Sequence, residues 1–489
     1  MALFSKLKSL LSLETTSGSD EYLFEKYSDK KIYPTVSPEA VEEYNKQRDN
    51  GSHKILCSAP FKNLYFSRHG DVFVCCHSRD YAIGQYPQQS IIQIWNGEKI
   101  EQLRKYLTNL NFSLGCQICQ ADFDRKAYSE VRANHFDQLP LDIDFPTMME
   151  FELDTTCNLE CIMCSGEFSS SIRKNRENRP ALTSPYDEKF VSELELFIPY
   201  LHETRFSGGE PFLVPLYLKM WNKIIETNPG CLISLQTNGT VMNEKIKAVL
   251  QKGRFEIGVS LDSMNKEIFE SIRVNAKFEK VMDNIHFFSD YCRNKNTAFR
   301  LSMCVMRNNW KELPDYIRMC NRFNAYASFH KVINPESLAL WNLSSSELYK
   351  INKHLEQFNF EGEVINKVSA ANISHYKNYT RQIKLWADRS LQTEAEEKEW
   401  TNLPLNNMRQ KFEIKLKNQI LKLKTENDSS YEILNNFTAL LDSFPQDKQQ
   451  QLIFMLARYD INIVVQRLRL KSLEELKKEV SNLLPEIDD

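Results

Sequence analysis

The middle of the chain alternates between two hydrophobic periods. Between residues 148 and 335, short apolar runs typical of β-strands are separated by longer stretches with apolar residues at helical spacing. Strands regularly separated by helices indicate βαβ units with a parallel sheet. The pattern predicts an α/β fold whose core is a partial TIM-type barrel, (β/α)6, with the active site at the carboxyl ends of the strands. The expected strands are MEFELD (149–154), ETRFS (203–207), LISLQ (232–236), FEIGVSL (255–261), AFRLSMCVM (298–306) and ASFHKV (327–332).

The pattern changes on both sides of this core. Ahead of it, a polar stretch without a clear period leads into short strand-like runs and one helix-like run. Behind it, apolar residues recur at helical spacing among Glu, Lys, Gln and Asn, and Ser472 with Glu475 forms a capping-box pattern. We therefore expect an N-terminal extension (1–54), a small first domain (55–125), a linker (126–147), the core (148–340) and a helical C-terminal domain (341–489).

The composition argues against some classes of partner. The chain has 489 residues, 26% of them charged, and its formal net charge of −3 provides no general attraction to nucleic acid or to an anionic membrane. No run reaches the roughly 18–20 consecutive apolar residues that span a bilayer. Lys6 and Lys8 interrupt the apolar start, which argues against a secretory signal. We therefore expect a cytoplasmic protein without a nucleic-acid or membrane partner, and its oligomeric state stays open.

The cysteines give the first sign of chemistry. Of the twelve, five fall between residues 57 and 119, and three lie within eight residues at Cys157, Cys161 and Cys164. Clustered cysteines in a cytosolic chain indicate metal sites rather than disulfides. The other four, Cys231, Cys292, Cys304 and Cys320, stand in apolar patterns and are expected to be packed core thiols.

Residues 157–164, CNLECIMC, place three thiols in a tight loop directly after the first expected strand. Three thiolates can hold three irons of a 4Fe–4S cube and leave the fourth iron open. A zinc site is the alternative reading of this spacing. Zinc usually takes a fourth Cys or His nearby, and residues 165–180 contain neither.

Short polar segments follow the next three expected strands. SGGEP (207–211) comes after the second strand, QTNGT (236–240) after the third and VSLDS (259–263) after the fourth, with ESIR, which ends at Arg273, further on. Together with the cysteine loop, these segments resemble the radical SAM superfamily. The resemblance implies that the open iron chelates S-adenosylmethionine (SAM), and that reductive cleavage of SAM yields a 5′-deoxyadenosyl radical.

The resemblance also assigns roles to individual residues. Gly208 and Gly209 would allow close backbone approach, and Glu210 would accept hydrogen bonds from the ammonium group of SAM. Met163 occupies a position that is often aromatic in the family and would pack on the adenine. The implied cluster ligands are Cys157, Cys161 and Cys164, and the implied cofactor-binding residues are Met163, Gly208, Gly209, Glu210, Thr237, Asn238, Ser260, Asp262 and Arg273.

A second set of cysteines precedes the core and ends in CQIC at 116–119. This unit resembles the SPASM/twitch domains, which bind auxiliary 4Fe–4S clusters, although those domains most often follow the core. A structural zinc on the same thiols is the alternative. The resemblance implies one auxiliary cluster on Cys57, Cys75, Cys116 and Cys119, with Cys76 as an alternative to Cys75 and His77 as a hydrogen-bonding neighbour.

We therefore expect a radical SAM oxidoreductase that modifies a peptide or protein side chain by hydrogen-atom abstraction. The expected electron donor is a flavodoxin or a ferredoxin. One rival is the same chemistry on a small molecule such as a sugar or an amine. Another is a non-catalytic metal-binding scaffold, against which the GGEP segment argues. The residues identify neither the substrate nor a general base.

Overall fold

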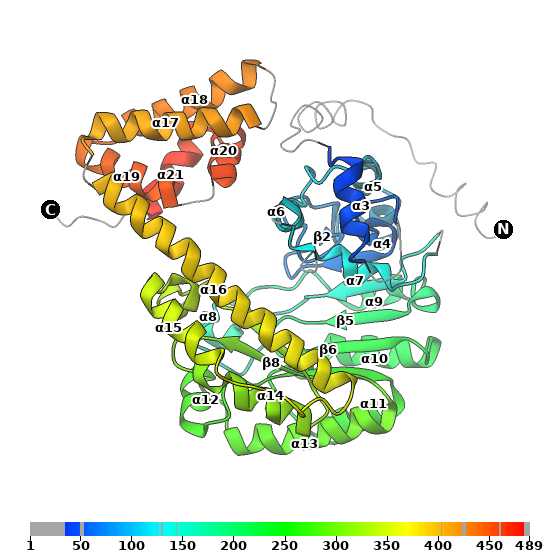
Figure 1. Cartoon of the computed structure of the whole chain (residues 1–489). Coiled ribbons are helices and arrows are strands. Elements are labelled where there is room, and N and C mark those ends of the chain that lie inside the picture. The colour runs from blue at the N-terminus through cyan, green and yellow to red at the C-terminus, as the bar shows by residue number, and fades with distance from the viewer. Residues whose placement is uncertain are drawn as a thin grey trace, which may run out of the picture.

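The computed structural model describes residues 35–48, 53–124, 126–128, 131–142, 144–401, 403–422, 427–458 and 461–483 (Figure 1). Most of the expected N-terminal extension lies outside these residues. Its described part contains α3 (Pro38–Asn45), which begins at Ser37. Tyr44 of this helix is completely buried, with its ring 5.4 Å from that of Phe123. The end of the extension is therefore packed onto the unit that follows.

A nine-stranded sheet in the order β3-β2-β1-β4-β5-β6-β7-β8-β9 runs through the described structure. The strands from β4 to β9 pair in parallel and are the ones that the sequence predicts. The prediction of a partial barrel of parallel strands is therefore confirmed. These strands are β4 (Met148–Phe151), β5 (Glu203–Phe206), β6 (Leu232–Thr237), β7 (Phe255–Ser260), β8 (Phe299–Val305) and β9 (Tyr326–Lys331).

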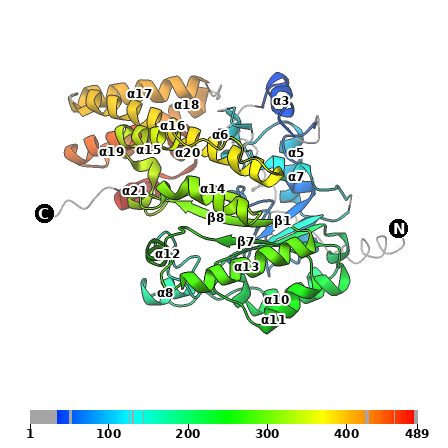
Figure 2. The same cartoon turned by 60° about the horizontal axis from the view of Figure 1, so that its bottom comes forward.

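Helices connect the parallel strands and cover one face of the sheet (Figures 1 and 2). Trp221 shows how this face is closed: its side chain is completely buried, 5.5 Å from the ring of Phe206 and 5.6 Å from that of Phe255. This packing leaves the carboxyl ends of the strands available for a site. The helices are α8 (Ser170–Asn175), α9 (Glu188–Leu194), α10 (Pro215–Thr227), α11 (Glu244–Lys252), α12 (Lys266–Ile272), α13 (Phe278–Lys295) and α14 (Leu313–Arg322).

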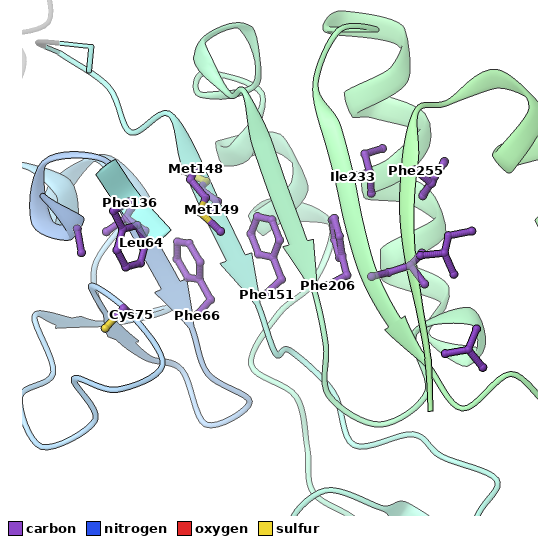
Figure 3. Packing of buried hydrophobic residues seen from close by; sticks show 14 of the residues in the cluster. Leu64, Phe66, Cys75, Phe136, Met148, Met149, Phe151, Phe206, Ile233 and Phe255 are labelled. Atoms are coloured by element: carbon purple, nitrogen blue, oxygen red, sulfur yellow. The ribbon is translucent and has the colours of Figure 1, made fainter. Parts of the chain in front are cut away.

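The first unit continues the same sheet. Its β1 (Asn63–Phe66) pairs in parallel with β4, and β2 (Asp71–Phe73) and β3 (Gly84–Gln85) follow antiparallel. Phe66, Phe151 and Phe206 form a row across β1, β4 and β5, with ring centroids 5.7 and 5.0 Å apart (Figure 3). The expected first domain and the core thus share one hydrophobic cluster. The helices of the unit are α4 (Ile91–Trp95), α5 (Glu98–Thr108) and α6 (Gln117–Asp124).

The segment 126–147, expected as a linker, is packed where the structure describes it. It contains α7 (Ala133–Asp137), and Phe136 is completely buried. The Lys62 ammonium donates hydrogen bonds to the carbonyl oxygens of Phe136 and Leu139, at 2.8 and 2.7 Å. The segment therefore joins the first unit to the sheet by buried contacts.

The region after β9 is helical, as predicted, and has two parts. The helix α15 (Ser345–Leu355) and much of α16 (Lys367–Thr401) contribute buried residues to the core cluster, among them Leu348 and Ile383. The helices beyond α16 enclose a hydrophobic cluster of their own (Figure 2). They are α17 (Leu405–Lys422), α18 (Asn427–Asp442), α19 (Gln446–Arg458), α20 (Ile461–Leu470) and α21 (Leu473–Leu483).

The capping box predicted at Ser472 is confirmed at the start of α21. The Ser472 N–H donates to Glu475 Oε2 at 2.8 Å, and the Glu475 N–H donates to Ser472 Oγ at 3.3 Å. Among the helices that the structure describes, none combines the length and the apolar character that a membrane crossing requires.

Candidate functional site

The cysteine loop follows the carboxyl end of β4 and is held from two sides. The Cys157 N–H donates to Ser170 Oγ at 3.1 Å, and the Ser171 hydroxyl donates to the Cys157 carbonyl at 2.7 Å. On the other side, the Ile162 N–H donates to the carbonyl oxygen of Ile272, the last residue of α12, at 3.0 Å. The three thiols of the loop therefore project from a fixed backbone at the strand ends, where the sequence places the active site.

Two N–H donors face these thiols. Asn238 Nδ2 lies 3.9 Å from Cys157 Sγ, and Arg273 Nη1 lies 3.9 Å from Cys161 Sγ. Burial nevertheless raises the pKa of all three thiols, that of Cys164 to about 11. A metal centre bound here would deprotonate them, since a ligating thiol must be a thiolate. Three cysteines, two of them with N–H groups directed at their sulfur atoms, suit a thiolate-ligated cluster.

Gly208 and Gly209 allow the loop after β5 to approach the cysteine loop. Their φ angles are +82° and +53°. A Cβ atom on Gly209 would lie 2.3 Å from the carbonyl oxygen of Thr156, to which the Glu210 N–H donates at 2.7 Å. Glycine is required here because the two backbones touch. The close approach to SAM expected of these glycines stays a prediction.

Glu210 connects the ends of β5 and β6. Its carboxylate accepts hydrogen bonds from the Thr237 hydroxyl and from the Asn238 N–H, both at 2.7 Å, and from the Phe212 N–H at 3.2 Å. The side chain is completely buried, and burial raises its pKa to about 7 although these donors oppose the rise. The structure therefore brings Glu210, Thr237 and Asn238 together beside Cys157.

Asp262 and Arg273 form a buried ion pair beside Cys161. Arg273 Nε donates to Asp262 Oδ2 at 2.7 Å, and the Cys304 N–H donates to Asp262 Oδ1 at 2.7 Å. Burial opposes the charge on the guanidinium, but the Asp262 carboxylate and Cys161 raise the pKa of Arg273. In this arrangement Arg273 is directed at Cys161, a predicted cluster ligand, a contact that the sequence-based assignment to SAM did not include.

Ser260 and Met163 have other neighbours than SAM was expected to provide. Ser260 accepts a hydrogen bond from Gln236 Nε2 at 2.9 Å and lies beside Ser302 in the strand register. Met163 is half-buried and packs against a small apolar cluster that contains Met306. Cys304 packs against the same cluster and is only partly buried, whereas the sequence predicts a packed core thiol. Cys231, Cys292 and Cys320 are buried as predicted.

The cysteines of the first unit surround one small cavity. Cys57, Cys75, Cys116 and Cys119 all line it, together with His77, Ser78 and Arg132. Cys76 does not line it, and its charged neighbours include Glu150, Arg132 and Arg79. Of the two adjacent cysteines, the cavity therefore favours Cys75. Within the described part of the chain, no three His, Cys, Asp or Glu side chains lie close enough together to hold a single metal ion.

Glu152, just after β4, links the first unit to the core beside the cysteine loop. It accepts hydrogen bonds from the Tyr65 hydroxyl at 2.5 Å and from Arg79 Nη2 at 3.1 Å, and it also pairs with Arg68. Arg68 in turn lies 4.0 Å from Glu167, which follows the last cysteine of the loop. A partly exposed polar network therefore joins the first unit to the segment after the cysteine loop, and no sequence motif indicates it.

Comparison with known families and proteins agrees with this architecture. Residues 152–320 match the model of the radical SAM superfamily, and residues 57–120 match the SPASM iron–sulfur cluster-binding domain. The chain therefore contains a radical SAM domain over residues 152–320, with a SPASM domain ahead of it.

Individual relatives match this radical SAM chain over part of their length. The cysteine-type anaerobic sulfatase-maturating enzyme of Clostridium novyi is 30% identical over 167 residues, 29% of this chain and 42% of the relative. The GTP 3′,8-cyclase of Chlorobaculum tepidum is 23% identical over 191 residues, 38% of this chain and 54% of the relative. The chain therefore spans about half the length of these curated relatives. The crystal structure of Streptococcus suis SuiB bound to S-adenosylmethionine covers 56% of this chain and 63% of its own, with 11% identity and a TM-score of 0.35.

The radical SAM domain implies a 4Fe–4S cluster and SAM, and the SPASM domain implies an auxiliary iron–sulfur cluster. The residues present fit both groups. At the first site, N–H groups face the sulfur atoms of Cys157 and Cys161. At the second, His77, Ser78 and Arg132 line the cysteine cavity and each carries a buried polar atom without a hydrogen-bond partner.

We expect Glu210→Gln to weaken SAM binding by the radical SAM domain roughly tenfold or more, because a hydrogen bond to a charged group contributes about 1.5–3 kcal/mol. The glutamine keeps the shape of the side chain but loses its charge. The new NH2 group also replaces a carboxylate oxygen that accepts hydrogen bonds from Thr237, Asn238 or Phe212, so a donor then faces a donor. Equilibrium dialysis with SAM on iron-loaded protein measures the effect.

The matched control is Glu256→Gln, another buried carboxyl on a core strand, paired with Arg300 rather than with the site residues. The pH dependence provides a second readout. Because the pKa of Glu210 is about 7, the carboxylate loses its charge as the pH falls through 7, and SAM affinity of the parent protein falls with it. The SAM affinity of Glu210→Gln should not show this fall near pH 7. Parent-like SAM affinity in Glu210→Gln would show that the ammonium group binds elsewhere.

Proposed function

We propose that this chain reductively cleaves SAM and uses the resulting radical to abstract a hydrogen atom from a side chain of a peptide or protein. The observation that supports this most is the joining of the two cysteine sets. The first unit adds β1 to the edge of the core sheet at β4, the strand that leads into the cysteine loop. A cluster in the first unit is thereby held in a fixed relation to the radical site.

The residues of the site have different proposed roles in binding the cluster and SAM. Cys157, Cys161 and Cys164 are the proposed cluster ligands, and the cluster with its bound SAM supplies a 5′-deoxyadenosyl radical when an electron arrives. Glu210 holds the ends of β5 and β6 together and provides a carboxylate for the SAM ammonium group. The Asp262–Arg273 pair directs an N–H group at Cys161 and fixes that side of the loop.

Cys57, Cys75, Cys116 and Cys119 are the proposed ligands of the auxiliary cluster. Four protein thiolates saturate a 4Fe–4S cube, so this cluster has no open iron for a substrate. We therefore propose that it accepts the electron that the substrate radical releases. A flavodoxin or ferredoxin is the proposed donor for the first cluster.

A peptide or protein substrate is supported by the relative from Clostridium novyi, whose name describes a sulfatase-maturating enzyme. The rival is a small molecule, and the GTP 3′,8-cyclase of Chlorobaculum tepidum supports it. The SPASM match over the first unit favours the peptide, because enzymes that carry SPASM/twitch domains often modify peptides.

Deuterium transfer distinguishes the two candidates. Iron-loaded protein is incubated with SAM, a chemical reductant and either a side-chain-deuterated peptide encoded beside the gene or deuterated GTP. Deuterium in 5′-deoxyadenosine from the peptide, measured by mass spectrometry, is the expected result. Transfer only from GTP would replace the peptide by a small molecule. Bound metal without any SAM cleavage would indicate a scaffold instead of an enzyme.

A further inference from the structure

Three buried polar atoms beside the auxiliary cavity have no hydrogen-bond partner of standard geometry: His77 Nδ1, Ser78 Oγ and Arg132 Nε. All three residues line the cavity that the four thiols surround. Leaving a buried donor without an acceptor is costly, and buried polar atoms in native proteins nearly always have partners. Arg132 Nε, which can only donate, and the Ser78 hydroxyl therefore point to an acceptor that occupies the cavity.

Arg132 is held in place by contacts that leave Nε unused. Its Nη2 pairs with Glu150 Oε2 at 3.3 Å, and Glu150 Oε1 accepts a hydrogen bond from Asn63 Nδ2 at 2.7 Å. Its backbone N–H is directed at the Cys119 thiol. The guanidinium is thus fixed between a carboxylate of β4 and the cavity wall, and its charge stands beside the thiols.

Ser78 provides a second donor from a different loop. The residue is completely buried, and its hydroxyl faces the Cys116 thiol. Ser78 and Arg132 approach the cavity from separate segments, so a shift of one loop does not explain both unpartnered atoms. The acceptors that a cysteine cavity can offer them are sulfur atoms.

We propose that Arg132 and Ser78 donate hydrogen bonds to the sulfurs of the auxiliary cluster and thereby raise its reduction potential. This inference rests on the proposed function in so far as that function places a 4Fe–4S cluster in the cavity. Hydrogen bonds to cluster sulfurs and nearby charge set the potential of iron–sulfur clusters. A donor, and above all the positive charge of Arg132, stabilises the reduced and more negative form. The auxiliary cluster then accepts an electron from a substrate radical more readily.

The test uses the full chain with Cys157, Cys161 and Cys164 replaced by Ala, so that the auxiliary cluster is the only one expected. In this background we compare Ser78→Ala, Ser78→Thr and Ser67→Ala. Ser67 is a matched control because it is also buried and its hydroxyl is also unpartnered, but it does not line the cavity. The reduction potential is measured by an EPR-monitored titration, and iron is counted in each protein.

Ser78→Ala is expected to shift the potential to a more negative value, Ser78→Thr to restore it and Ser67→Ala to leave it unchanged. Arg132→Met should produce a larger negative shift because it also removes a charge. Its control is Glu150→Gln, which breaks the ion pair but keeps the guanidinium, and which should not make the potential more negative because it removes a negative charge.

Parent potentials in both Ser78→Ala and Arg132→Met, with iron content unchanged, would overturn the inference and leave the proposed function standing. Zinc instead of iron in the background protein would remove the auxiliary cluster itself, and the inference with it. Iron lost from Ser78→Ala but kept in Ser78→Thr would support a contact between the hydroxyl and the cluster.

Discussion

Replacing Cys157, Cys161 and Cys164 together by Ala is expected to remove about half of the iron and to abolish SAM cleavage. The anaerobically reconstituted parent should hold about eight irons in two 4Fe–4S cubes, and each cube needs its thiolates. Cys157 and Cys164 are partly buried and Cys161 is buried, so circular dichroism must confirm that the variant is folded. Iron analysis and the yield of 5′-deoxyadenosine measure the two effects.

The control for this variant is the replacement of three thiols outside both sites, Cys231, Cys292 and Cys320, by Ala. These residues are buried in the core cluster, so their loss tests the effect of removing cysteines as such. We expect this control to keep both clusters and to cleave SAM. Unchanged iron in the loop variant, or one zinc and no iron in the parent, would contradict the assignment.

The second large effect is expected from Cys116→Ala with Cys119→Ala. This change removes two ligands of the auxiliary cluster, so about four irons should be lost from the parent's eight. The loop at 157–164 keeps its ligands and its anchors at Ser170 and Ile272. SAM cleavage without substrate should therefore continue at a measurable rate. Conversion of the true substrate should collapse, because its electron no longer has an acceptor.

Circular dichroism must accompany this variant, since loss of a metal centre can unfold the unit that holds it. The shared sheet makes unfolding a real concern, because β1 is hydrogen-bonded to β4. Cys76→Ala is the matched control: it removes a thiol next to Cys75 that does not line the cavity. If the folded double variant converts substrate at the parent rate, the auxiliary cluster has no catalytic role.

The parallel core was predictable because its signal is local. Each strand from β4 to β9 is a short apolar run bounded by amphipathic helices, and periodicity alone identifies it. The pairing of β1 with β4 was not predictable in this way. Between Phe66 and Phe151 lie the SPASM cavity and the packed segment with α7, and strand pairing over that distance leaves no periodic signal. The sequence therefore suggested two domains where the structure has one sheet.

The same distinction between local and long-range signals applies to the candidate site. The cysteines were found from spacing, since cluster ligation demands thiols at fixed intervals. The choice between Cys75 and Cys76 depended on which side chain of the turn after β2 lines the cavity, and only the structure favours Cys75. The position of Arg273 beside SAM stays a prediction. Its contacts in the structure are with Asp262, which is close in sequence, and with Cys161, which is 112 residues away. A polar contact between residues so far apart in the chain leaves no recognisable sequence motif.

The most direct test of the central claim is the cleavage of SAM itself. Anaerobically reconstituted protein, mixed with SAM and dithionite, should release 5′-deoxyadenosine and methionine in equal amounts, and Glu210→Gln should do so only at higher SAM concentration. Protein that holds about eight irons in two cubes yet yields no 5′-deoxyadenosine with saturating SAM would contradict the account.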